Sequence, residues 1–70
     1  MNQDDLIYDL IFSEKTNYRI DISDYVSDIY KHDDFVDHIK HVLKRAKVKV
    51  VKSFVVLDSK TVMWDLKVKK

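Results

Sequence analysis

Basic side chains dominate the second half of this 70-residue sequence, and their chemistry is the most readily inferred. Ammonium and guanidinium groups neutralise phosphate oxygens and release the counterions that nucleic acids hold. Lys40, Lys44 and Lys47 recur at a spacing that places them on one side of a helix. The candidate nucleic-acid-binding residues are Lys40, His41, Lys44, Arg45, Lys47, Lys49, Lys52, Lys60, Lys67 and Lys69. Basic side chains are also common at the C-terminal ends of helices and on solvent-exposed strands, so a purely structural role competes with this interpretation.

The charges are divided unevenly along the chain. Residues 1–37 carry ten acidic and three basic side chains, whereas residues 38–70 carry two acidic and ten basic side chains. The charges nearly cancel over the whole chain, which has a net charge of +1. This asymmetry favours an anionic partner for the basic half, or else neutralisation of one half by the other within the fold.

Two histidines lie in the segment with the strongest helical pattern. His38 and His41 are three residues apart, and Asp34 and Asp37 each precede one of them by four residues. Imidazole and carboxylate groups on one helix face could bind zinc. The spacing differs from the HExxH motif and no further cluster supports it, so we expect surface Asp–His pairs, no metal site and no cofactor.

The composition excludes several kinds of catalytic site. The chain has no cysteine, so it has neither disulfides nor thiolate metal ligands. It has no glycine, which excludes the P-loop, the dinucleotide fingerprint and the nucleophile elbow, because each needs backbone close to a ligand or in a strained turn. Seventy residues also enclose little concave volume. We therefore expect no catalytic residues and a protein that is not an enzyme.

Hydrophobic periodicity predicts the elements that position these side chains. We predict helices over 4–13, 24–31 and 34–46, and strands over 17–22, 48–57 and 61–69. Residues 4–13 also fit a strand, and the second and third helices could be continuous. The alternative architecture is therefore two β-hairpins on either side of one long helix. Either arrangement gives a single α+β domain over residues 1–70.

The sequence also predicts which residues share each face of the C-terminal hairpin. A loop of two or four residues would pair Leu57 with Val62 and place Val51, Val55 and Leu57 on the face of Trp64. Val50, Phe54, Val56 and Met63 would then share the opposite face. A three-residue loop would reverse the faces and bury Lys52, which is less favourable. The predicted core residues are Val36, Ile39, Leu43, Val55, Trp64 and Leu66.

The order helix, strand, helix, helix, strand, strand resembles that of the winged helix-turn-helix superfamily. Tyr25, Val26, Ile29, Val36 and Ile39 occupy positions that correspond to the buried positions of that motif. Tyr30 departs from the pattern, because the family often has a small residue, commonly glycine, in this turn. The resemblance implies a DNA-binding regulator of transcription whose second motif helix enters the major groove while the hairpin, or wing, touches the DNA backbone.

Three carboxylates argue against the usual docking of such a helix. Asp33, Asp34 and Asp37 begin the segment that would read bases, and they would repel phosphate. Double-stranded DNA would therefore be bound through the basic helix end and the wing. The alternative hypothesis is a small protein-binding modulator or inhibitor, of the kind that phages encode, that docks on a larger protein. Its interface would be Val50, Phe54, Val56 and Met63.

The chain also allows an expectation about location and assembly. No apolar run approaches the ~20 residues that span a membrane. The first residues are acidic and lack the features of a signal peptide, so we expect an intracellular, cytoplasmic protein. A domain of this size buries only ~60% of its unfolded surface, so a homodimer could supply further burial.

Overall fold

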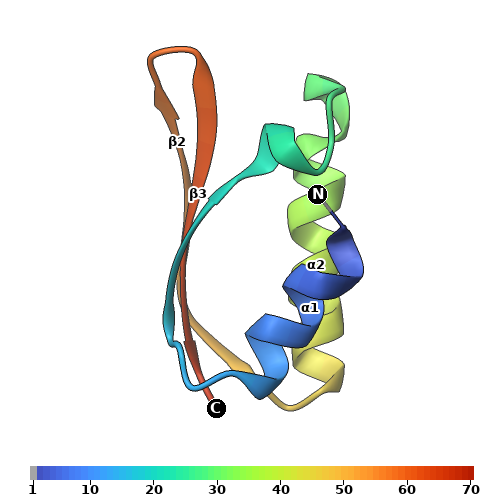
Figure 1. The fold of residues 1–70 in the computed structure, drawn as a ribbon, viewed down its shortest axis with the longest axis vertical. Coiled ribbons are helices and arrows are strands. Elements are labelled where there is room, and N and C mark those ends of the chain that lie inside the picture. Colours follow the sequence, from blue (N-terminus) through green and yellow to red (C-terminus); the bar gives the residue numbers. More distant parts are fainter. Residues whose placement is uncertain (1) are drawn as a thin grey trace.

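Two helices lie against one face of a three-stranded antiparallel sheet (Figure 1). The computed structural model describes residues 2–70. Its elements are α1 (Gln3–Phe12), β1 (Asn17–Asp21), the 3₁₀ turns η1 (Ile22–Asp24) and η2 (Ile29–Lys31), α2 (His32–Arg45), β2 (Lys49–Asp58) and β3 (Thr61–Lys69). The strand order is β1-β3-β2. The predicted α+β class and the C-terminal hairpin are confirmed, and the arrangement is compatible with a winged-helix-like fold.

The first segment is a helix, so the alternative with two hairpins is wrong. Asn2 caps α1 by accepting a hydrogen bond from the backbone N–H of Asp4 at 2.8 Å. Leu6 and Leu10 point into the core from one face of the helix. The apolar residues at strand spacing, Tyr8 and Phe12, are exposed instead and contact each other across one turn.

The predicted helix over 24–31 is wrong. Only η2 lies within this segment, because η1 ends at Asp24 and residues 25–28 are irregular. Ile29, predicted to be buried, is 63% exposed. Asp21 accepts a hydrogen bond from the N–H of Ser23, and Asp28 accepts one from the N–H of Tyr30. Aspartate side chains bonded to nearby backbone in this way compete with helix formation.

The long helix α2 begins at His32, earlier than the predicted Asp34, because η2 runs directly into it. Phe35, Val36, Ile39 and Leu43 form its buried stripe. The His32 ring is also buried, and its Nε2 lies 2.9 Å from the carbonyl oxygen of Val26. This contact ties the irregular segment between the two turns to the start of α2.

The core is centred on the middle strand. Trp64, Leu66 and Val68 of β3 are buried beneath the helices, together with Tyr18 and Ile20 of β1. Five of the six predicted core residues are confirmed. The prediction for Val55 is wrong, because it is 44% exposed. Val55 pairs with Trp64 in register, but it lies on the edge strand β2, where the cover from the helices is incomplete.

A β-bulge alters the hairpin near its base. Leu57 pairs with Val62 and Val55 with Trp64, as the two-residue turn requires. Between Val50 and Lys52 the register shifts, so Val50 pairs with the buried Val68. An extra residue in one strand reverses the alternation of faces beyond it. The prediction that Val50 shares a face with Phe54 is therefore wrong, since Val50 packs against the core.

Candidate functional site

A groove of about 510 Å³ lies between the second half of α2 and the start of β2. Its lining residues are Lys40, His41, Lys44, Lys47, Val48, Lys49 and Val50, and we call this site the basic groove. Lys40 and His41 are adjacent on α2, Lys44 lies about one turn later, and the other residues come from the connection and the strand. The four lysines are exposed, whereas Val48 is buried and Val50 is half-buried. The groove thus combines a basic rim with an apolar floor.

The end of α2 is shaped by a specific turn that assembles this groove. The N–H of Val48 donates to the carbonyl of Leu43 at 2.9 Å, and the N–H of Lys47 donates to the carbonyl of Lys44 at 3.1 Å. This pair of bonds is the Schellman motif, which ends a helix with one residue in the left-handed region. Lys47 has that conformation, with φ of 62°. The turn therefore holds Lys47 beside Lys44 while Val48 enters the core.

No aspartate or glutamate is among the residues that line the basic groove, although Asp37 lies one helical turn before Lys40 and His41 on α2. Over residues 2–70, the ion pairs within 4.0 Å join Arg19 to Asp58 and Asp65, on β1 and the hairpin. Lys44 lies in the last turn of α2 and Lys47 follows the end of the helix, where the helix dipole favours positive charge. The groove is consequently a local centre of positive charge in a chain whose net charge is only +1.

The other predicted basic residues do not line this groove. Arg45 is exposed at the last position of α2, and Lys69 lies beside the end of α1. Lys60 occupies the hairpin turn, at the opposite end of the molecule from the connection between α2 and β2 (Figure 1). The structure therefore brings together five of the ten candidate residues and separates the helix end from the wing.

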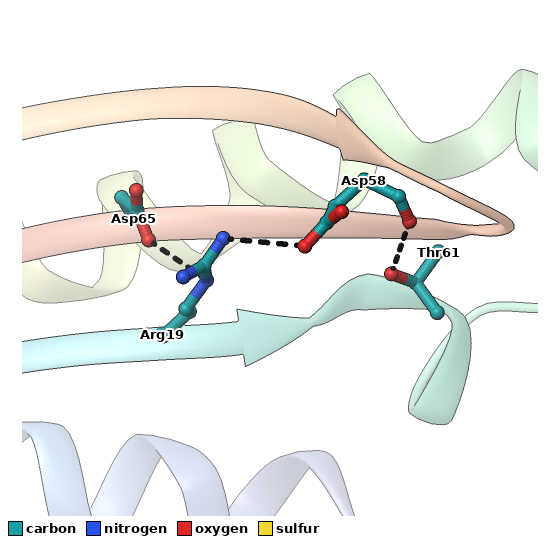
Figure 2. A network of polar contacts seen from close by, with 4 residues as sticks. All are labelled: Arg19, Asp58, Thr61 and Asp65. Atoms are coloured by element: carbon teal, nitrogen blue, oxygen red, sulfur yellow. Dashed lines mark hydrogen bonds and ion pairs between the residues drawn. The ribbon is translucent and has the colours of Figure 1, made fainter.

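Lys52 and Lys67 pair with each other across β2 and β3, on the sheet face away from the helices. This outer face carries its own polar network. Arg19 lies 3.6 Å from a carboxylate oxygen of Asp65 and 3.7 Å from one of Asp58, as Figure 2 shows. The hydroxyl of Thr61 donates to the carbonyl of Asp58 at 2.8 Å and braces the turn. The positive and negative charges of these side chains offset one another, so the outer face has no single sign of charge.

The predicted protein interface is only partly assembled. Phe54, Val56 and Met63 lie on the outer face, where Val56 pairs with Met63. Phe54 is 41% exposed, and the ammonium of Lys52 lies 4.8 Å from its ring centre. Val50 is excluded from this set by the bulge. The remaining cluster is small and partly covered by a lysine.

The two histidines of the possible metal site are both exposed on α2, and His41 lines the basic groove. Within residues 2–70, no three His, Cys, Asp or Glu side chains are grouped so that they could hold a metal ion. A helix long and apolar enough to cross a membrane is likewise absent from this part of the chain.

Val48 and Val50 are the groove residues that the sequence analysis did not place there. Their alternation with Lys47 and Lys49 was visible in the sequence, but the Schellman turn and the bulge determine which way these side chains face. Comparison with family models, with curated proteins and with solved structures finds no match to this chain.

Proposed function

We propose that this protein binds nucleic acid by holding the sugar-phosphate backbone against the basic groove. The observation that carries the proposal is the convergence of Lys40, Lys44, Lys47 and Lys49 on one groove that no carboxylate lines. Each ammonium group that neutralises a phosphate releases condensed counterions, which is the main source of affinity in such complexes. Phosphate contacts position a protein on the duplex but do not read its sequence.

The side chains available favour backbone contact over base recognition. Arginine makes the commonest specific contact, a bidentate pair with guanine. The chain has only two arginines; Arg19 is ion-paired on the outer face, and Arg45 does not line the groove. Phenylalanine, tyrosine and tryptophan, on which the bases of single strands stack, do not line the groove either. The preferred ligand is therefore double-stranded DNA with little sequence preference.

A protein-binding modulator is the less favoured function. Its predicted interface has lost Val50 to the helix side of the sheet, and the ring of Phe54 is partly covered by Lys52. The basic groove, in contrast, is continuous across α2 and β2. Lys60 lies too far from the groove to share a bound phosphate with it, because the hairpin turn is at the other end of the molecule (Figure 1).

Fluorescence anisotropy with a labelled DNA duplex tests this function. The variant Lys40→Ala/Lys44→Ala removes two charges from the groove, and we expect it to weaken binding about tenfold or more at low salt. The matched control Lys60→Ala/Lys67→Ala removes the same charge outside the groove and should have a much smaller effect. All four side chains are exposed, so the fold should tolerate both changes. The proposal fails if the unmodified protein binds no duplex at low salt, or if both variants lose affinity equally.

A further inference from the structure

The strand β2 presents a free edge along its length. The strand order β1-β3-β2 leaves it paired on one side only. The turn at Ser59 and Lys60 has two residues, so the carbonyl of Asp58 and the N–H of Thr61 face each other across it. Counting from this closing pair, alternate residues direct their N–H and C=O groups away from β3. Those residues are Ser53, Val55 and Leu57, and their backbone groups can pair with another strand.

The side chains of this edge are unusually apolar. Val51, Phe54, Val55 and Leu57 are all exposed, and Leu57 reaches 77%. Edge strands are commonly protected by shortness or by charges along the strand. The other edge, β1, has only five residues, including Arg19 and Asp21. In β2, the five residues between Lys52 and Asp58 carry no charge.

We propose that two copies of this protein form a dimer in which their β2 strands pair antiparallel, with the two-fold axis at Val55. The two sheets then form one continuous sheet of six strands. In this register Lys52 of each copy lies opposite Asp58 of the other, and Phe54 lies opposite Val56. All four of these side chains are on the outer face, so the outer face of one sheet continues into the outer face of the other.

The positions of the charges select both the partner and the register. Lys52 and Asp58 bracket the apolar segment with opposite signs, so the segment is complementary to itself when it is turned around. An axis at Phe54 would set Lys52 opposite Val56, and an axis at Val56 would set Asp58 opposite Phe54. Both alternatives lose the two ion pairs. The contact of Asp58 with Arg19 is 3.7 Å long between exposed groups, so it does not hold the carboxylate away from a partner (Figure 2).

A charge exchange tests the dimer independently of nucleic-acid binding. Sedimentation equilibrium of the unmodified protein, from micromolar to millimolar concentration, should show a mass rising from 8.4 kDa towards twice that value. The variants Lys52→Asp and Asp58→Lys each place like charges opposite each other in a homodimer, so each alone should remain monomeric. An equimolar mixture of the two variants should associate, because the heterodimer regains both opposite-charge pairs. The double variant Lys52→Asp/Asp58→Lys should associate as the unmodified protein does.

Three results would overturn the proposal. The first is a mass of 8.4 kDa for the unmodified protein at every concentration. The second is association of the single variants that is as strong as that of the unmodified protein. The third is a mixture and a double variant that both stay monomeric although circular dichroism shows them folded. Since neither substitution touches the basic groove, duplex binding by the monomeric variants separates a failed dimer from a failed binding site.

Discussion

The indole Nε1 of Trp64 donates a hydrogen bond to the hydroxyl oxygen of Ser53 at 2.8 Å, linking β3 to β2. Trp64 is fully buried, and its ring meets that of Phe35 from α2 in an edge-to-face arrangement with 6.3 Å between the ring centres. One side chain therefore joins the hairpin to α2, the helix that supplies three of the seven residues lining the basic groove.

Trp64→Ala should destabilise the fold by ~3–5 kcal/mol, because it leaves a large cavity at the junction of sheet and helix. So small a domain has little stability in reserve, and we expect the variant to be largely unfolded. Ser53→Ala should cost ~1–3 kcal/mol, since it leaves the buried indole N–H without a partner. Thermal unfolding followed by circular dichroism measures both. Cooperative melting of Trp64→Ala near the temperature of the unmodified protein would contradict this account of the core.

Two residues occupy the left-handed region that favours glycine. One lies in the basic groove and the other lies outside it, so glycine substitutions at the two positions can be compared. Lys47 has φ of 62° and Ser59 has φ of 54°. Lys47→Gly and Ser59→Gly should each stabilise the protein by about 0.5–1 kcal/mol, because a side chain in this conformation is strained. Only Lys47→Gly removes a charge from the basic groove, so it alone should weaken duplex binding. If Lys47→Gly stabilises the fold and binds DNA with unchanged affinity, Lys47 has no role in the site.

The hydroxyl of Tyr25 should make stability depend on alkaline pH. Its pKa is raised above the ordinary value of 10.0, first by burial and then by the negative charges of Asp24, Asp5 and Asp9. The folded protein thus holds the proton more tightly than the unfolded chain does. This contribution is fully present below pH ~10 and is lost as the pH rises through the folded pKa.

The variant Tyr25→Phe isolates this effect. It keeps the ring that stacks on Phe35, with 5.6 Å between ring centres, and removes the titrating group. Between pH ~9 and ~11, the urea midpoint should fall less for Tyr25→Phe than for the unmodified protein, since lysine deprotonation is common to both. Parallel decreases in the two midpoints would show that Tyr25 does not titrate differently on folding.

Phe54→Asp should leave the fold intact. Phe54 lies on the outer face of the sheet and is 41% exposed, so we expect a loss of only ~1 kcal/mol, consistent with β-propensity differences on an edge strand. The same variant should weaken the proposed dimer, in which Phe54 lies opposite Val56. Unfolding of Phe54→Asp in urea at a far lower concentration than the unmodified protein would mean that Phe54 contributes to the core.

The regular elements of this fold could be predicted where periodicity and capping agree. The alternation of Val62, Trp64, Leu66 and Val68 predicts β3, and the apolar stripe through Ile39 and Leu43 predicts α2. The segment 24–31 has apolar residues at helical spacing. Asp21 caps the turn that ends at Asp24, and Asp28 caps a second turn inside the segment, so the two turns replace one continuous helix. Pattern alone does not reveal which of two local hydrogen-bonding schemes has the lower free energy.

The site was predictable in composition but not in geometry. The basic helix end was visible in the sequence, and Lys40, Lys44 and Lys47 do lie together. The apolar floor depends on the bulge near Val51, which inserts one residue into β2 and leaves no clear trace in the alternation. The separation of Lys60 from the groove depends on the length of the hairpin relative to α2, which only the assembled fold determines.

The salt dependence of duplex binding tests the central claim most directly. The logarithm of the association constant should fall linearly with the logarithm of salt concentration, with a slope of about −0.9 for each phosphate that the groove neutralises. Lys44→Ala should reduce the magnitude of this slope by about one unit relative to the unmodified protein, whereas Lys67→Ala on the outer face should leave it unchanged. An unchanged slope for Lys44→Ala, or an affinity that does not depend on salt, would contradict the assignment of the basic groove as a phosphate-binding site.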